Sequence, residues 1–140
     1  MQQQLSVITL GIADLARSRR FYGDGFGWAP VFQNEDIVLY QMNGFVLGTW
    51  LVKALEDDMR RSLQRPGAFS LAHNVSSGEE VQALLDRLAG HGGRILRPAD
   101  APPHGGVRGY VADPDDHAWE IAWNPAWHIS PEGYVRFIPA

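Results

Sequence analysis

The chain of 140 residues contains no cysteine, which excludes disulfide bonds, thiolate metal ligands and a cysteine nucleophile. It also lacks an apolar run of about 18 residues, so we expect no transmembrane helix. The first ten residues, MQQQLSVITL, lack the basic segment and small-residue cleavage site of a signal peptide. We therefore expect a cytoplasmic protein that does not associate with membranes.

Two further absences narrow the function. The formal net charge is −4 and the basic residues are scattered, so no basic face for nucleic acid is expected. Neither a Gly-x-Ser-x-Gly elbow nor a P-loop is present. Three alternating glycines, Gly23, Gly25 and Gly27, follow a predicted helix rather than open one, so they are better explained as its end than as a phosphate loop.

The first half of the chain alternates between strand and helix patterns. Apolar and β-branched residues predict a strand over residues 5–12, and Asp14 is a good N-cap for a helix over residues 15–24. The pair Asn43-Gly44 is a strong hairpin signal. The other elements predicted in this half are strands over residues 28–32, 36–42 and 45–51 and a helix over residues 53–63.

The second half repeats this order. A strand is predicted over residues 69–75, followed by a helix that Ser76 or Ser77 caps. A short strand at 94–96, a loop at 98–103 and a hairpin of strands 107–112 and 118–123 complete the half. A shift of 63 positions superimposes strand, cap, helix and closing glycine, as in these pairs: Ile8 on Leu71, Ile12 on Val75, Asp14 on Ser77, Phe21 on Leu84, and Gly27 on Gly90. The sequence therefore predicts one α+β domain of two modules, about 1–64 and 67–124, with a tail at 125–140.

Three segments carry a resemblance to a known superfamily. They are VITLGIADLARSRRFY with the following GFGW, then LAHNV, and finally GYVADPDDHAWEI, in which Asp116 replaces the glycine of an Asp-Pro-Asp-Gly turn. Together they resemble the vicinal oxygen chelate superfamily, which includes glyoxalase I, bleomycin-resistance proteins and extradiol dioxygenases. The resemblance implies two βαβββ modules whose curled mixed sheets surround a shared cleft, and it implies a homodimer.

The same resemblance implies four metal-ligand positions, two in each module. In this sequence they hold Val7, Gly48, Ser70 and Glu120. Only Glu120 is a good ligand for a divalent cation, so the usual metal is not expected. Two histidines nearby have structural explanations: His73 should face the helices if Ser70 faces the cleft, and His117 should be solvated in its turn.

Alternation along the strands predicts which residues face the cleft. Most are small and would leave room, whereas Trp50 would supply an aromatic surface unless it is core. The predicted cleft-facing set is Val7, Thr9, Gly11, Val46, Gly48, Trp50, Ser70, Ala72, Asn74, Ala118, Glu120 and Ala122. His104, in the loop before the last hairpin, is a candidate ligand contact at the cleft mouth.

Glu120 has two interpretations. A buried carboxylate without a partner could act as a general base, whereas one paired with Arg108 or Tyr110 is structural. A three-residue loop at the last turn would place Tyr110 opposite Glu120 and Arg108 on the cleft side. A two-residue loop would turn both away.

These observations favour a metal-free protein that binds a small apolar or cationic organic molecule. The expected site comprises Thr9, Trp50, Ser70, His104, Arg108 and Glu120. The first alternative is a glyoxalase-like lyase or isomerase that uses Glu120 as its base, with or without a weakly held metal. The second is a domain that fills its own cleft and works through protein contacts. The tail aromatics Trp123, Trp127, Tyr134 and Phe137 are expected to cover a core edge or a dimer contact.

Overall fold

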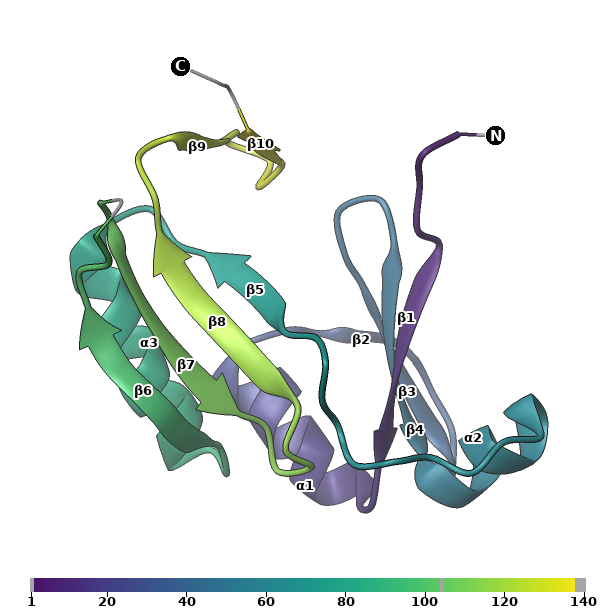
Figure 1. Cartoon of the computed structure of the whole chain (residues 1–140). Coiled ribbons are helices and arrows are strands. Elements are labelled where there is room, and N and C mark those ends of the chain that lie inside the picture. Colours follow the sequence, from purple (N-terminus) through teal and green to yellow (C-terminus); the bar gives the residue numbers. More distant parts are fainter. Residues whose placement is uncertain (1, 104, 138–140) are drawn as a thin grey trace. The chain divides into compact units, whose positions relative to one another are not determined.

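A computed structural model describes residues 2–103 and 105–137. The chain divides into two compact units, Met1–Arg65 and Pro66–Ala140 (Figure 1). Each unit contains its own four-stranded sheet and its own helices. Within the described ranges, no helix is long and apolar enough to cross a bilayer.

Unit 1 is a mixed sheet in the order β1-β4-β3-β2, in which β1 runs parallel to β4 and the other pairs are antiparallel. Asp14 caps the first helix, because its carboxylate accepts from the Arg17 N–H at 2.7 Å. The elements are β1 (Val7–Ile12), α1 (Leu15–Arg19), the π-helical turn η1 (Arg20–Gly25), β2 (Pro30–Gln33), β3 (Ile37–Gln41), β4 (Val46–Leu51) and α2 (Val52–Met59).

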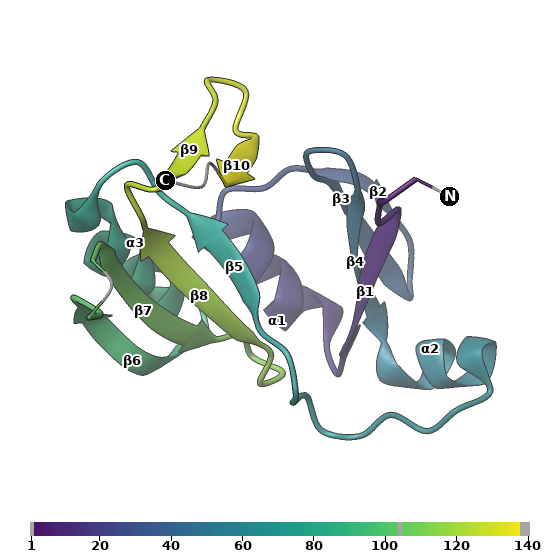
Figure 2. The same ribbon diagram turned by 45° about the horizontal axis from the view of Figure 1, so that its top comes forward.

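Unit 2 repeats the plan with the order β5-β8-β7-β6, and β5 runs parallel to β8. Its long helix α3 covers one face of this sheet (Figure 1). A two-stranded hairpin continues from the end of β8 (Figure 2). The elements are β5 (Leu71–Asn74), α3 (Gly78–Gly90), β6 (Arg94–Asp100), β7 (Val107–Ala112), β8 (Ala118–Trp123), β9 (Trp127–Ile129) and β10 (Val135–Phe137). The predicted α+β class with two βαβββ modules is confirmed.

The two modules also share their strand register. Thr9 of β1 lies opposite Gly48 of β4, and Ala72 of β5 lies opposite Glu120 of β8. Because the 63-residue shift takes Thr9 to Ala72, Gly48 and Glu120 occupy equivalent positions in their sheets. Glu120 is thus a carboxylate at a position where the first module has no side chain.

The covered face of each sheet holds the apolar core. In unit 2 the helix stripe of Val81, Leu85 and Leu88 is fully buried, as are Val111 and Ile121 of the sheet. The helix approaches β7 so closely that a Cβ at Gly109 would lie 2.4 Å from Leu85 Cδ1. The equivalent core of unit 1 comprises Leu10, Ile12, Phe21, Tyr22, Val38, Tyr40 and Leu47.

Several predicted boundaries are wrong. The helix predicted over residues 15–24 changes to a π-helical turn at Arg20, and the one predicted over 53–63 ends at Met59 because Arg60 adopts a left-handed conformation with φ 54°. The strand predicted over 94–96 extends to Asp100, so residues 98–100 are not loop. Pro98 is tolerated there because β6 is an edge strand, where no ladder hydrogen bond is lost.

The two histidines predicted to be structural differ in outcome. His73 lies opposite Ile121, which is fully buried, so His73 faces the helix side as predicted. The expectation that His117 is solvated is wrong, because only 5% of it is exposed. Asp113 holds it there: the Asp113 carboxylate accepts from His117 Nδ1–H at 2.9 Å and from the His117 backbone N–H at 2.8 Å.

Candidate ligand-binding site

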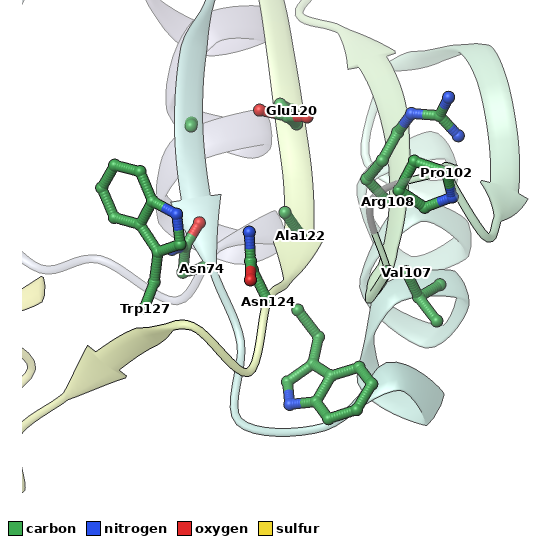
Figure 3. Close-up of a pocket in the computed structure, with 11 residues that line it drawn as sticks. Asn74, Pro102, Val107, Arg108, Glu120, Ala122, Asn124 and Trp127 are labelled. Carbon is green, nitrogen blue, oxygen red and sulfur yellow. The ribbon is translucent and has the colours of Figure 1, made fainter. Parts of the chain in front are cut away.

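A pocket of about 290 Å³ opens on the face of the unit 2 sheet that α3 leaves uncovered (Figure 3). Strand β8 supplies Glu120 at its centre, flanked by the small side chains of Ala72 and Ala122. Within the described ranges, the lining residues are Ala72, Asn74, Pro102, Gly105, Val107, Arg108, Glu120, Ala122, Trp123, Asn124 and Trp127. Every one of these residues belongs to unit 2.

The β7–β8 turn determines which side chains reach this face. The Asp113 N–H donates to the His117 carbonyl at 2.9 Å, which leaves three residues in the loop. Asp116 takes the left-handed conformation, φ 73°, that glycine favours at the end of such a loop. Tyr110 consequently lies opposite Glu120 and Arg108 opposite Ala122. The structure therefore selects the three-residue alternative, and Arg108 reaches the pocket.

Glu120 is half-buried and accepts a hydrogen bond from the Tyr110 hydroxyl. Burial, followed by the negative charge of Glu120 and this hydrogen bond, raises the pKa of Tyr110, while Arg108 and Arg97 act in the opposite direction. Glu120 is thus not an isolated carboxylate, and of the two donors considered from the sequence, Tyr110 is the one that bonds to it. A carboxylate has about four acceptor sites, so Glu120 keeps capacity for a ligand.

Arg108 is held from the neighbouring edge strand. Its guanidinium forms an ion pair with Asp100, which lies opposite it on β6. Asp100 also accepts from Arg97 Nη2 at 2.7 Å, so one carboxylate connects two arginines. This arrangement offsets part of the charge of Arg108, whose side chain lies along one wall of the pocket (Figure 3).

Residues after β8 form the opposite wall. The Asn124 side chain accepts from the Ala126 N–H at 3.0 Å, and the Asn124 carbonyl accepts from the Trp127 N–H at 3.0 Å. This turn directs Trp127, which is 41% exposed, to the side of the pocket near Asn74 (Figure 3). Gly106 lets the loop pass close by, since a Cβ there would lie 2.4 Å from the Trp123 carbonyl oxygen.

The predicted site residues separate into distinct groups. Glu120 and Arg108 line the same pocket. Thr9 and Trp50 belong to the sheet of unit 1, and Ser70 is exposed just before β5. His104 lies outside the described residues.

The room predicted beside the small residue of β1 is partly filled. A Cβ at Gly11 would lie 2.6 Å from Leu63 Cδ1 and 3.7 Å from Leu55 Cδ2, so Leu63 and α2 pack over this end of the strand. Trp50 lies opposite Gly11 on the same face and is half-buried there. Small residues on a strand mark close packing here rather than an open wall.

Sequence reasoning overlooked Trp127 as a wall of the pocket and assigned it to a core edge or a dimer contact. The available signal was Asn124-Pro125 directly after the strand that carries Glu120, because an asparagine before proline favours a tight turn back toward that strand. Asn74 was on the predicted cleft face but was not selected, and its half-buried amide now lines the pocket.

The residues at the four family metal positions do not fit a divalent cation. Val7 and Gly48 offer no donor atom, Ser70 offers a neutral hydroxyl, and Glu120 already accepts from Tyr110. Across residues 2–103 and 105–137, no group of three or more His, Asp or Glu side chains could hold a metal ion.

Comparison with known families agrees with this geometry. A model of the Glyoxalase/Bleomycin resistance protein/Dioxygenase superfamily matches residues 4–121. The chain belongs to this superfamily. The matched residues include strands of both modules and end one residue after Glu120, so Trp127 and the β9–β10 hairpin lie outside the match.

Solved structures show the same fold. A glyoxalase-related enzyme from Fulvimarina pelagi is 61% identical, with a TM-score of 0.96 over 99% of this chain and 100% of that one. A family member from Burkholderia phytofirmans PsJN is 17% identical, with a TM-score of 0.78 over 86% of this chain and 98% of that one. A lactoylglutathione lyase from Agrobacterium tumefaciens is 16% identical, with a TM-score of 0.66 over 89% and 96%. The last two support the fold alone.

Proposed function

We propose that this protein binds a small apolar or cationic organic molecule in the unit 2 pocket, without the divalent metal usual in its superfamily. The observation that supports the proposal most directly is the set of residues around Glu120. The one good donor among the four family metal positions lies in a pocket between an indole ring and two alanines, and it is already hydrogen-bonded by Tyr110.

The lining suits such a ligand chemically. The Trp127 ring offers a flat apolar surface, and the Glu120 carboxylate offers a negative charge on the same pocket, a combination that stabilises planar or cationic groups. Asn74 can both donate and accept at the edge of a bound ring. Because Asp100 pairs with Arg108, the positive charge opposite is reduced and a cation meets less repulsion.

Metal retention tests the metal-free part of the proposal. Purified, untagged protein is exposed to Zn²⁺, Ni²⁺, Mn²⁺ and Fe²⁺, desalted, and analysed for metal content. We expect retention well below one equivalent, because a single carboxylate and waters hold a divalent cation weakly. Near-stoichiometric retention would reject the proposal and favour a metal enzyme.

Ligand binding tests the pocket itself. A set of aromatic and cationic compounds is screened by thermal shift, and each hit is titrated against Glu120→Ala and Trp127→Ala. We expect each substitution to weaken binding about tenfold, the loss typical of one charge or stacking contact of about 1.4 kcal/mol. Tyr134→Ala is the matched control, since Tyr134 is an exposed aromatic of the same tail that does not line the pocket. Equal losses in all three variants would place the ligand elsewhere.

A second candidate is a glyoxalase-like lyase or isomerase, and one observation favours it. The 61% identical protein from Fulvimarina pelagi is described as a glyoxalase-related enzyme. In this candidate, Glu120 takes a proton from carbon next to a carbonyl and, as the neutral acid, returns it at another position, while the Tyr110 hydroxyl holds the Glu120 side chain in place through its hydrogen bond. Glu120→Gln separates the candidates, because an enzyme loses turnover while it keeps its ligand, whereas a binding protein shows no turnover to lose.

We also propose that the protein is a homodimer and acts in the cytoplasm. Large apolar side chains exposed on each unit support a second copy, among them Leu5, Val7, Val31, Phe32 and Phe69. Light scattering tests the assembly, because the monomer mass is 15.6 kDa and a dimer has twice that mass. Cell fractionation tests the location.

A further inference from the structure

Unit 1 carries a second hollow that the proposed function does not use. It measures about 440 Å³ and lies between the first helical segment and the edge strand β2. The polar and charged residues on its wall are Arg19, Arg20, Asp24, Gln33 and Tyr40. All of them belong to unit 1, so this hollow shares no lining residue with the pocket that contains Glu120.

The two arginines of this hollow lie where α1 changes to η1. Arg19 ends the α-helix and Arg20 begins the π-helical turn, and both line the wall together with Asp24 on the following turn. Two adjacent guanidinium groups on one wall therefore concentrate positive charge, and π-helical turns of this kind occur often at functional sites.

The wall is rich in hydrogen-bond donors. Arg19 Nη1 donates to Gln33 Oε1 at 3.0 Å, which occupies the Gln33 carbonyl and leaves its NH₂ group as a donor. Arginine has five N–H donors and no acceptor. Among the described residues of this wall, Asp24 is the one carboxylate, against two arginines. A ligand that complements this wall must be rich in acceptors and negatively charged.

Tyr40 provides an independent sign of a missing partner. Only 1% of Tyr40 is exposed, and its hydroxyl has no hydrogen-bond partner within the described ranges. A buried polar group without a partner costs about 1–3 kcal/mol. Burial raises the pKa of Tyr40 to about 12, with Arg19 opposing and Asp24 adding to the effect, so the hydroxyl stays protonated at neutral pH and can only be stabilised by an acceptor or a solvent molecule.

We propose that this hollow is an oxyanion site that binds the carboxylate or phosphate group of a small molecule. Arg19 and Arg20 pair with the oxyanion, and the Tyr40 hydroxyl donates to it from the floor. Guanidinium groups match the planar geometry of such oxygens and bind them through two parallel hydrogen bonds. The site stands whether or not the unit 2 pocket binds a ligand, since the two share no residue.

Nuclear magnetic resonance of the whole ¹⁵N-labelled protein tests the site. Inorganic phosphate and sodium acetate are titrated separately at neutral pH, with NaCl adjusted to hold the ionic strength constant. We expect saturable shifts centred on residues 16–24, Gln33 and Tyr40, and the tighter of the two anions identifies the preferred group. Arg19→Gln and Arg20→Gln should each weaken binding about tenfold, and Tyr40→Phe about threefold or more.

Arg17→Gln is the matched control, because Arg17 is an exposed arginine of the same helix that does not line the hollow. Its affinity should equal that of the parent protein. Shifts that rise linearly without saturation, or equal losses in the Arg17, Arg19 and Arg20 variants, would reduce the effect to nonspecific attraction and overturn the proposal. A Tyr40→Phe protein that is folded by its dispersed spectrum and binds as tightly as the parent would overturn it as well.

Discussion

Asp113 shows how much one side chain can determine in this protein. Its carboxylate accepts from the backbone N–H groups of Asp115 and His117 and from the His117 ring. Both Asp113 and His117 are buried, so water cannot readily replace the bonds between them. The turn they close sets the register of β7 on β8, and with it the position of Tyr110 beside Glu120.

Replacing this carboxylate should therefore be costly. Asp113→Ala leaves three donors without an acceptor, and we expect the free energy of unfolding to fall by about 2–4 kcal/mol. Asp113→Asn keeps one acceptor oxygen and should cost less. Urea unfolding of the three proteins checks the order, and an alanine variant as stable as the parent would contradict this account of the turn.

His73 should make stability depend on pH. Burial lowers its pKa below the ordinary value for histidine, because the charged ring is poorly solvated on the helix side of the sheet. The unfolded chain takes up a proton near that value and the folded chain does so only at lower pH. The contribution of neutral His73 to the free energy of unfolding is complete above the pKa of the unfolded chain. It is lost as pH falls toward the lower pKa of the folded chain.

The measurement is urea unfolding at about pH 7.5 and about pH 5.5, on either side of the ordinary histidine pKa. The parent protein should lose stability at the lower pH, and His73→Gln should lose less. His128→Gln, at an exposed histidine, should behave like the parent. A parent whose stability is the same at both pH values would show that His73 is not protected from protonation.

Among the elements, the packing of α3 on β7 depends on one glycine. A Cβ at Gly109 would lie 2.4 Å from Leu85 Cδ1 and 2.9 Å from the Arg97 carbonyl oxygen, and the second atom is backbone that cannot rotate away. At Gly48 the nearest atom is Leu39 Cδ2 at 3.2 Å, the end of a flexible side chain. Gly48 lies on β4 and Gly109 on β7, in the equivalent sheets of the two units. Only at Gly48 can the neighbouring atom move to make room for a methyl group.

We therefore expect Gly109→Ala to lower the free energy of unfolding by about 2–3 kcal/mol, the usual cost of overpacking. Gly48→Ala should cost less than about 1 kcal/mol, because Leu39 can adjust. Thermal unfolding of both variants checks the difference. If the two variants were equally destabilised, the close approach of helix and strand would not be the cause.

The strands and helices could largely be predicted from the sequence, because apolar periodicity and caps such as Asp14 act locally. Predictions failed where a particular side-chain contact or turn decides the outcome. His117 is buried by a carboxylate four residues away, which composition alone does not reveal. Trp127 reaches the pocket through a turn at Asn124. The sequence pattern instead favoured Trp50 as the aromatic surface of the site. Alternation identifies the face of a residue, but only packing shows whether that face is open.

For the whole molecule, the division into two units predicts that a ligand in the unit 2 pocket protects mainly the amides of unit 2. The unit 2 pocket draws its lining from β5, β7, β8 and the segments next to them. A ligand that binds there stabilises the residues it contacts against local opening. Hydrogen exchange with a bound screening hit should therefore slow amides of residues 71–74, 107–112 and 118–127, while those of 7–12 and 46–51 change little. Uniform protection of both units would contradict a site confined to unit 2.

The pairing of the last two strands has a practical consequence for anyone who handles this protein. Phe137 of β10 lies opposite Trp127 of β9. Residues attached after Phe137 therefore continue directly from β10, the strand that pairs with β9. Strand β9 begins with Trp127, whose indole ring lines the pocket. An affinity handle fused at that end could alter ligand measurements that the same handle at the other end would leave intact, so screening should compare both fusions with the untagged chain.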